Sequence, residues 1–279
     1  MTRTIEQIIT PQQIKDYRTH GFVHIPNIIT TQEAGLYHQA ALEATEQRAS
    51  LHEGSIFKQH VNNWQHNDVI KKLTLHPTVA AAAQTLAGVA LRLWHDHTLI
   101  KMPRNSTPTE FHQDQPYWPH ENSFAPLSAW IALCDVPVEC GCMTFIPGSQ
   151  DQTQLPAQNL ADPKSLFELC PKLQWEPRVT VPLKAGDCTF HHGRCAHMAT
   201  PNITDDPRVA HVIIFIDQET TYAGTPHVVT DPLNLKAGHT LDHPLFPTVQ
   251  QILDGKVESF NSHKKGRVDD NHPQCTTTI

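Results

Sequence analysis

The stretch GDCTFHHGRCAHMATPNITDDPRVAHVIIFI, residues 186–216, carries the pattern that decides the fold. Two short apolar segments, Cys188 to His191 and Val209 to Ile216, are separated by Gly, Pro and Asn residues. Short apolar segments divided by turn residues are typical of strands in an antiparallel sandwich or barrel. The same pattern occurs upstream at Leu91 to Met102, Ser128 to Val136, Met143 to Ile146 and Val179 to Leu183. Residues 89–217 are therefore predicted to form a strand-rich core.

The first 88 residues are predicted to be mostly helical. Thr10-Pro11 provides an N-cap followed by a proline at the first helical position, and a short strand from Phe22 to Ile25 follows that helix. A second helix is expected from Thr30 to about Leu51, because a Thr with a Glu three residues later is the capping-box pattern. A third is expected from Asn67 to Leu86, whose Ala-rich end favours a helix.

Composition excludes several classes of protein. The chain has 279 residues, of which 39% are hydrophobic and 18% charged, and its formal net charge is −7. No dense basic run is present, so we expect no nucleic-acid partner. No signal peptide and no apolar stretch of ~18 residues is found, so we expect no membrane span. Seven cysteines without a regular framework indicate free thiols in a reducing compartment, and we expect a cytoplasmic protein.

The sharpest local motif is Phe111-His112-Gln113-Asp114. In an extended strand, residues two apart project from the same face, so an imidazole and a carboxylate in H-x-D could bind one metal ion. A second His from elsewhere would complete the facial triad of non-haem iron(II) oxygenases, which leaves three coordination positions open. In a chain with 20 His, H-x-D alone is weak evidence, because a surface pair is the default interpretation.

The segments around this motif strengthen the interpretation. The sequence resembles the phytanoyl-CoA dioxygenase family of iron(II)- and 2-oxoglutarate-dependent oxygenases. The resemblance runs from about residue 11 to 217 and includes Tyr17 with Gly21-Phe22-Val23, the segment Glu139 to Gln150, and the Gly186-Asp187 strand that leads to His197.

The resemblance implies a site. His112, Asp114 and His197 would be the iron ligands and the catalytic residues. Arg208, eleven residues after His197, would pair with the far carboxylate of 2-oxoglutarate, and Trp130 would lie beside this cosubstrate. Many relatives have a Ser two residues after the distal His, where this chain has Ala199, and Thr200 is the candidate to replace that contact. Candidates for the substrate pocket are Tyr117, Trp118, His191 and His192, and we expect only one of the two histidines to face it.

The resemblance also implies a fold and a reaction. The fold class is mainly β with flanking helices around a double-stranded β-helix, a cupin-like jelly-roll. We expect a single oxygenase domain over residues 1–279, with a helical buttress at 1–88, the core at 89–217, an irregular segment at 218–258 and a polar tail at 259–279. The reaction would be hydroxylation of an unactivated C–H bond of a small-molecule metabolite, in which 2-oxoglutarate and O2 become succinate and CO2.

Two alternatives remain open at this stage. One is a non-redox, cupin-like metalloprotein, and the other is an isomerase that uses the same metal site. Neither would require a carboxylate-binding arginine beyond the distal ligand. His95 and His97 form a same-face pair that could bind metal, but a pocket wall or a polar barrel face is the preferred interpretation because no matching carboxylate follows them. Neither the substrate nor an oligomeric state follows from the sequence.

Overall fold

The structure is a computed structural model that describes residues 4–46, 56–105 and 107–257. Two antiparallel sheets form its core. The larger sheet has the strand order β1 (Phe22–Ile25), β9 (Cys188–His192), β6 (Leu127–Ala132), β11 (Arg208–Asp217), β3 (Leu91–Lys101) and β2 (Lys58–Val61). The smaller sheet has the order β4 (Thr109–His112), β10 (His197–Ala199), β7 (Met143–Phe145) and β8 (Val179–Val181). A ribbon of β5 (His120–Glu121) and β12 (Thr221–Tyr222) accompanies them.

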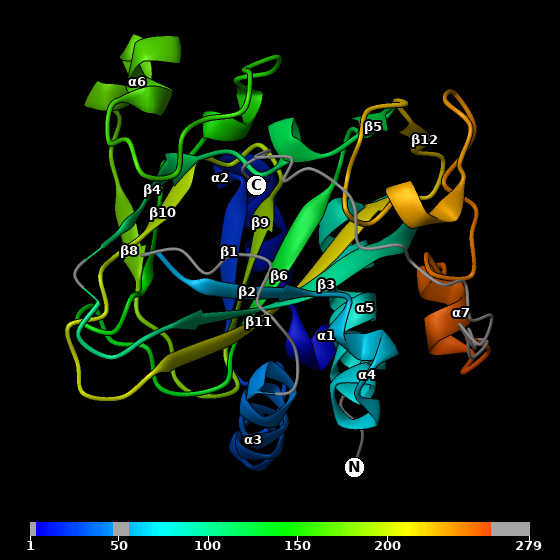
Figure 1. Ribbon diagram of the computed structural model, residues 1–279, viewed down its shortest axis with the longest axis horizontal. Coiled ribbons are helices and arrows are strands. Elements are labelled where there is room, and N and C mark those ends of the chain that lie inside the picture. Colours follow the sequence, from blue (N-terminus) through cyan, green and yellow to red (C-terminus); the bar gives the residue numbers. More distant parts are fainter. Residues whose placement is uncertain (1–3, 47–55, 106, 258–279) are drawn as a thin grey trace, which may run out of the picture.

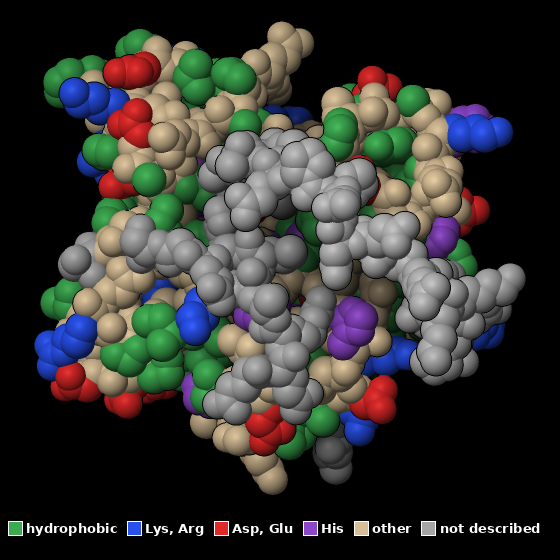
Figure 2. All heavy atoms as spheres, in the orientation of Figure 1, with side chains coloured by type: hydrophobic (Ala, Val, Ile, Leu, Met, Phe, Trp, Pro, Cys, Tyr) green, Lys and Arg blue, Asp and Glu red, His purple; other side chains and the backbone are tan. Residues whose placement is uncertain are grey.

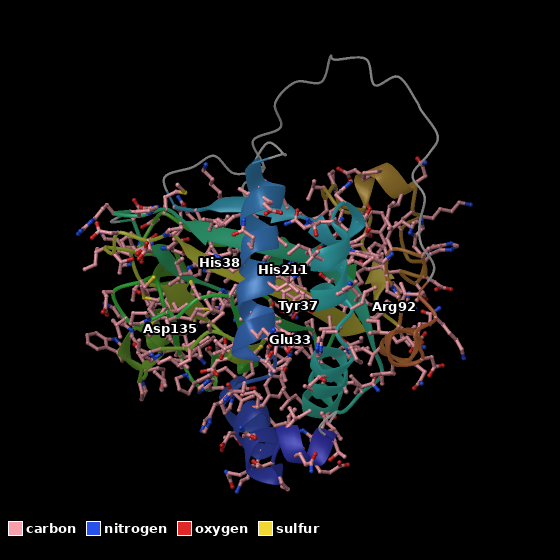
Figure 3. The ribbon with its side chains drawn as sticks, turned by 90° about the horizontal axis from the view of Figure 1, so that it is seen from below. Glu33, Tyr37, His38, Arg92, Asp135 and His211 are labelled. Atoms are coloured by element: carbon pink, nitrogen blue, oxygen red, sulfur yellow. The ribbon has the colours of Figure 1, made fainter. Side chains whose placement is uncertain are left out.

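Helices flank the two sheets. They are α1 (Ile5–Ile8), α2 (Pro11–His20), α3 (Thr31–Glu46), α4 (Asp68–Thr74), α5 (Pro77–Ala87), α6 (Ser165–Leu169) and α7 (Val249–Leu253). Of these, α6 is the one that packs against the smaller sheet, at β4. Short 3-10 helices occur at Asn63–Gln65, Gln115–Tyr117, Ser149–Asp151, Pro171–Trp175 and Asp231–Leu233. Helices α3, α4 and α5 lie on one side of the larger sheet, while β4, β10 and β8 lie on the other (Figure 1). Seen from below, α3 runs across the sheet and carries Tyr37 and His38 (Figure 3). The predicted class, mainly β with flanking helices, is confirmed.

The predicted helix starts are confirmed. The Thr10 hydroxyl accepts a hydrogen bond from the Gln13 N–H at 3.2 Å, and the Gln13 side chain accepts one from the Thr10 N–H at 2.9 Å. Thr30 and Glu33 make the same reciprocal pair at 3.1 and 2.8 Å. These bonds satisfy N–H groups that have no partner within the helix. Helix α3 is described to Glu46, and the expected end near Leu51 lies outside the described residues.

The single helix predicted from Asn67 to Leu86 is wrong. The structure has two helices there, α4 and α5, with a break at Leu75 and His76. The cause is Pro77, which begins α5. Proline lacks an N–H and disfavours helical backbone in the residue before it, and His76 accordingly has φ −68° and ψ 118°. Because the Ala-rich sequence of α5 favours a helix, one continuous helix was predicted and the break was missed.

The predicted core strands are found within one to four residues of their expected ends. All inter-strand pairs are antiparallel, and the longest is β11 with β3, from Arg208 opposite Lys101 to Asp217 opposite Leu91. Strands β2, β5 and β12 were not predicted. The irregular segment after Asp217 contains only β12, one 3-10 helix and α7, and the polar tail lies outside the described residues. No helix in the described part of the chain is long and apolar enough to span a membrane.

Candidate metal and cosubstrate site

Two histidines from neighbouring strands meet at one edge of the smaller sheet. His112 is the last residue of β4 and His197 the first of β10, and the two are directly opposite each other in the antiparallel pairing. Residues paired in this way have Cβ atoms roughly 5 Å apart, so their side chains can converge on one point. Their ring centroids are 4.3 Å apart. The register of this strand pair therefore brings together two residues that are 85 positions apart in the sequence.

Backbone carbonyl groups orient both rings. The Nδ1 of His112 donates to the carbonyl of Glu110 at 2.7 Å, and the Nδ1 of His197 donates to that of Cys195 at 3.0 Å. A carbonyl only accepts, so in the neutral form of either ring the proton lies on Nδ1 and Nε2 carries the lone pair. Burial, followed by the neighbouring His112, lowers the pKa of His197 to about 3, so this ring is neutral at pH 7. In both histidines Nε2 is therefore the atom available to a metal ion.

The carboxylate of Asp114 lies beside the two histidines, but the backbone that places it there differs from the prediction. Asp114 is not on a strand: β4 ends at His112, and Asp114 has helical backbone angles (φ −73°, ψ −44°) just before the 3-10 helix Gln115–Tyr117. The expectation that His112 and Asp114 share one face of an extended strand is therefore wrong. The turn nevertheless places Asp114 Oδ1 3.5 Å from His112 Nε2 and 3.6 Å from His197 Nε2.

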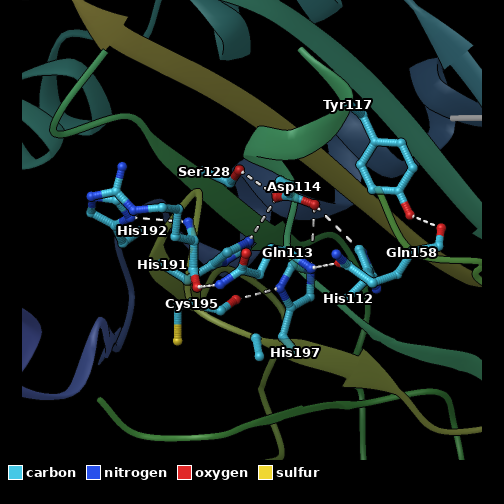
Figure 4. A network of polar contacts seen from close by, with 12 residues as sticks. His112, Gln113, Asp114, Tyr117, Ser128, Gln158, His191, His192, Cys195 and His197 are labelled. Carbon is cyan, nitrogen blue, oxygen red and sulfur yellow. Dashed lines mark hydrogen bonds and ion pairs between the residues drawn. The ribbon is translucent and has the colours of Figure 1, made fainter. Parts of the chain in front are cut away.

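The second carboxylate oxygen of Asp114 is held from the larger sheet. Ser128 Oγ donates to Oδ2 at 3.0 Å, and His191 Nε2 lies 3.3 Å from the same oxygen (Figure 4). Burial alone would raise the pKa of Asp114, but His197, His112 and His191 together hold this pKa well below its usual value. The carboxylate is therefore ionised, with one oxygen oriented by protein donors and the other directed at the two imidazoles.

This donor set fits a divalent transition metal. The ligand atoms of His112, Asp114 and His197 all lie within 4.8 Å of one another, and they form the one such group of metal-binding side chains found among the described residues. Two neutral imidazoles and one carboxylate, all from one side, are the ligands of non-haem iron(II) centres. The structure thus brings the three predicted ligands together.

A buried arginine lies in the same pocket. Arg208 begins β11, is 2% exposed, and lies with its guanidinium carbon 5.2 Å from the centre of the Trp130 ring. Its Nε and Nη1 have no hydrogen-bond partner in the described part of the chain. Burial lowers the pKa of Arg208 to about 10, and the group remains charged at pH 7. A buried cation with two unpaired donors fits an anionic ligand, because a guanidinium binds a carboxylate through two parallel hydrogen bonds.

The pocket contains most of the remaining predicted residues. Tyr117, Trp118, Trp130, His191 and Arg208 line it together with the three candidate ligands. His192 does not line it: its Nε2 donates to the Phe124 carbonyl and its Nδ1 accepts from the Arg194 N–H. His191 is thus the histidine that faces the pocket, as expected for one of the pair.

Thr200 is not in the pocket either. Its hydroxyl donates to the backbone carbonyl of Val138 at 2.7 Å, and Ala199 lines the pocket instead. The structure therefore gives no support to the expectation that Thr200 replaces the missing serine. Ala199 is the residue of β10 that reaches the pocket because it shares a face with His197, two positions before it.

Sequence reasoning missed several residues of the site and its pocket. Ser128 shares a strand face with Trp130, two positions later, so this spacing could have identified it. His227 and Val228 line the pocket from the irregular segment after β12. No local pattern marks His227, because its position depends on how a loop packs against the sheet.

Comparison with known proteins identifies related sequences. A family model described as phytanoyl-CoA dioxygenase (PhyH) matches residues 17–210. Phytanoyl-CoA dioxygenase domain-containing protein 1 of Rattus norvegicus is 28% identical over 152 residues, which are 52% of this chain and 52% of that protein. The chain thus spans about half the length of the first curated relatives that it matches.

Two solved structures are more similar. One is the non-haem, alpha-ketoglutarate-dependent carbocyclase SnoK from nogalamycin biosynthesis, which is 35% identical with a TM-score of 0.80 and covers 89% of this chain and 99% of its own. The other is the epimerase SnoN of the same pathway, 34% identical with a TM-score of 0.75, covering 85% and 95%. SnoN has also been crystallised with Fe3+, alpha-ketoglutarate and nogalamycin RO.

Proposed function

Because this chain belongs to the phytanoyl-CoA dioxygenase family, we propose that it is an iron(II)- and 2-oxoglutarate-dependent enzyme that oxidises a C–H bond of a small molecule. One observation carries the proposal: the group of His112, Asp114 and His197 shares a pocket with Arg208, a buried cation with unpaired donors. A metal-binding barrel that did not use an anionic cosubstrate would have no need of a buried arginine at this position.

In this proposal the three side chains hold iron(II) from one side. His112 and His197 bind through Nε2, and Asp114 binds through Oδ1. Ser128 and His191 fix the plane of the carboxylate through Oδ2. Outer partners of this kind orient metal ligands, and their removal typically weakens metal binding about 10- to 100-fold. A metal ion held by these three side chains would activate dioxygen with the help of a 2-oxo acid.

Arg208 would bind the far carboxylate of 2-oxoglutarate. Its Nε and Nη1 are buried donors without a hydrogen-bond partner among the described residues, and a carboxylate would supply the missing acceptors. The Trp130 ring packs against the guanidinium and limits its rotation. Ala199 offers no hydroxyl to the cosubstrate, so Arg208 carries the polar recognition of this carboxylate without the serine that many relatives have.

When bound, iron(II) and 2-oxoglutarate supply the activation of dioxygen and the removal of a hydrogen atom from the substrate, with succinate and CO2 as by-products. The chain's own contribution is positional. Arg208 fixes the cosubstrate at one end, and Asp114 is held in one orientation. The aromatic side chains of Tyr117 and Trp118 keep the space beside the metal group poor in water.

Hydroxylation is the outcome that we propose first. A second candidate is rearrangement of the carbon framework or of a stereocentre, because the similar structures are a carbocyclase and an epimerase at 35% and 34% identity. Each of these reactions requires that a carbon centre lose its hydrogen. Mass spectrometry of the product separates them: hydroxylation adds an oxygen atom, oxidative ring closure removes two hydrogen atoms, and epimerisation leaves the mass unchanged.

The deciding experiment is anaerobic. Iron(II) and then 2-oxoglutarate are added to the protein, and the visible metal-to-ligand charge-transfer band of the chelate is recorded. We expect the band to form in the wild type and to require much more 2-oxoglutarate in Arg208→Met. If iron binds but no band forms, the cosubstrate assignment is wrong and a non-redox metalloprotein becomes the better description. Succinate release under air then serves as the readout of a substrate screen.

A further inference from the structure

Three histidines that are not candidate metal ligands form one wall of the pocket. His95 and His97 project from the same face of β3, and His227, from the segment after β12, packs against His95. The ring centroid of His95 is 5.4 Å from that of His97 and 6.2 Å from that of His227. These three rings, which we call the histidine wall, are not among the described side chains grouped closely enough to hold a metal ion.

The sheet register gives the position of this wall. His95 pairs with Ile214 of β11 on one side, and Ser128 of β6 pairs with Ile214 on the other. Since neighbouring strands are about 4.8 Å apart, His95 lies on the order of 10 Å across the sheet from Ser128, the residue that holds Asp114. Arg208 is six residues further along β11, roughly 20 Å of extended chain. His95 therefore lies across the sheet from Ser128, beside the metal group, and is distant along β11 from Arg208.

The hydrogen bonds of His227 define its protonation. The backbone N–H of Val229 donates to His227 Nδ1 at 3.2 Å, so this nitrogen carries a lone pair and the proton lies on Nε2. The Nε2 atom is buried and has no partner in the described part of the chain. Burial lowers the pKa of His227 to about 4, which agrees with a neutral ring. His227 therefore offers one unused N–H donor.

The hydrogen bonds of His97 and His95 define the other donor and the acceptor that the histidine wall offers. The side-chain amide of Gln59 donates to His97 Nδ1 at 3.2 Å, which leaves the proton of His97 on Nε2. His95 Nδ1 donates to the backbone carbonyl of Asp96 at 3.2 Å, and burial lowers the pKa of His95 well below its usual value. A neutral His95 with its proton on Nδ1 has an acceptor at Nε2. Two donors and one acceptor suit the hydroxyl and carbonyl oxygens of a ligand.

Charged groups are scarce in the same space. Among the described residues that line the pocket, Asp114 and Arg208 are the only carboxylate and the only guanidinium or ammonium group, and both have roles in the metal and cosubstrate site. The nearby Lys101 does not line the pocket, because its Nζ donates to the carbonyls of Thr107 and Thr200. Figure 2 shows one face of the molecule, on which charged side chains lie mostly toward the edge and histidines are seen both near the middle and at the edge. Among the described lining residues, a charged substrate would therefore find no further counter-charge to offset the loss of its hydration.

Aliphatic and aromatic side chains form the remaining walls of the pocket. Trp118 is 9% exposed and packs so closely on Gly193 that a Cβ there would lie 2.8 Å from the Trp118 ring. The hydroxyl of Tyr117 donates to the Gln158 carbonyl, so the pocket meets the ring of Tyr117 rather than a free hydroxyl. Phe57 adds a third aromatic side chain. Flat apolar walls of this kind favour ring systems through stacking and edge contacts.

From these observations we propose that the histidine wall recognises the substrate, and that the substrate is an uncharged ring compound bearing hydroxyl or carbonyl oxygens rather than a coenzyme A thioester or another anion. The inference rests on the proposed function, since the ligand must lie between this wall and the metal group. His227 and His97 would donate to substrate oxygens, and His95 would accept from a substrate hydroxyl.

The test compares ligands that differ only in charge. The full chain is loaded anaerobically with iron(II) and 2-oxoglutarate, and equilibrium dialysis measures the binding of a hydroxymethylanthraquinone and of the anthraquinone carboxylate with the same ring. Octanoyl-CoA is the third probe. We expect the neutral alcohol to bind at least about tenfold more tightly than the carboxylate, because only the carboxylate must give up the hydration of a charge. We expect octanoyl-CoA to bind no better than the carboxylate.

Matched variants locate the binding site. His227→Phe keeps a ring of similar size and removes the N–H donor, and we expect it to weaken binding of the neutral alcohol about five- to tenfold. His239→Phe is the control, because His239 is exposed and does not line the pocket. It should leave the dissociation constant unchanged. The 2-oxoglutarate charge-transfer band should be the same in both variants, since neither residue belongs to the metal or cosubstrate site.

The outcomes separate this inference from the proposed function. If the band forms but the neutral alcohol fails to bind, the carboxylate or octanoyl-CoA binds as tightly, or His227→Phe has no effect, the assigned substrate class is wrong and the proposed function stands. If no band forms in the wild type, the proposed function fails and this inference fails with it.

Discussion

Replacing Arg208 by Met should make the ligand-free protein more stable and should weaken its binding of 2-oxoglutarate. The guanidinium is 2% exposed, and two of its nitrogens have no hydrogen-bond partner in the described part of the chain. A buried charge without a partner destabilises the folded state. In the ligand-free protein the buried charge of Arg208 therefore destabilises the folded state. Binding of the cosubstrate carboxylate would offset this destabilisation. Met fills the space of the arginine stem and carries no charge.

The size of this effect follows from the pKa of Arg208. Burial lowers this pKa from 12.5 to about 10, and at about 1.4 kcal/mol for each pKa unit the charged form is disfavoured by ~3 kcal/mol. Arg208→Met should thus raise the free energy of unfolding of the ligand-free protein by about 1–3 kcal/mol. Removing one partner of a charge-assisted pair costs roughly 2–5 kcal/mol, so 2-oxoglutarate should bind about 30-fold to several thousand-fold more weakly.

Two assays on the same preparation test this reasoning. Urea unfolding of the metal-free protein, followed by tryptophan fluorescence, gives the change in stability. Anaerobic titration of the charge-transfer band gives the 2-oxoglutarate dissociation constant. Arg208→Lys is the control, because it keeps a charge but loses the paired donors, and it should bind weakly without a gain in stability. If Arg208→Met unfolds more easily than the wild type and still binds 2-oxoglutarate normally, the arginine is a structural residue and not the cosubstrate's partner.

Three further predictions concern the rest of the site. Asp114→Ala should lose iron and all succinate formation, as measured by metal analysis and a coupled assay; a variant with full iron content and activity would show that the carboxylate is not a ligand. Ser128→Ala should weaken iron binding about 10-fold, read from a competitive chelator titration, because it removes a donor to Oδ2 of Asp114. Acidification should destabilise the metal-free protein: an unfolded His takes up a proton near pH 6.5, whereas burial lowers the pKa of His227 to about 4 and that of His95 well below its usual value. Stability should therefore fall from pH 6.5 toward pH 4, by up to about 1.4 kcal/mol per pH unit for each such histidine, and urea midpoints in His227→Phe should depend less on pH.

Much of the local structure could be predicted from the sequence because it depends on neighbouring residues. The pairs Thr10 with Gln13 and Thr30 with Glu33 cap their helices within a single turn. The strands of the core follow the alternation of apolar segments with turn residues. The one failure among the long helices arose at Pro77, where a strong Ala-rich pattern outweighed the signal of a single proline.

The ligand types of the site were also predictable, but their geometry was not. His112, Asp114 and His197 could be chosen because a facial metal site needs two imidazoles and a carboxylate, and the family resemblance indicated which ones. The argument that placed Asp114 on a strand was wrong: a turn, not strand alternation, directs its carboxylate at the two rings.

Only the tertiary structure decided which segments far apart in the chain contact each other. The pairing of β4 with β10 sets His112 opposite His197, and the packing of β6 against β9 and β11 places Ser128 and His191 on Asp114. The approach of His227 to His95 depends on a loop with no regular pattern. The sequence shows which hydrogen-bond donors and metal ligands the chain contains. Which of them meet depends on sheet register and loop packing, because these are set by burial of the whole core rather than by neighbouring residues.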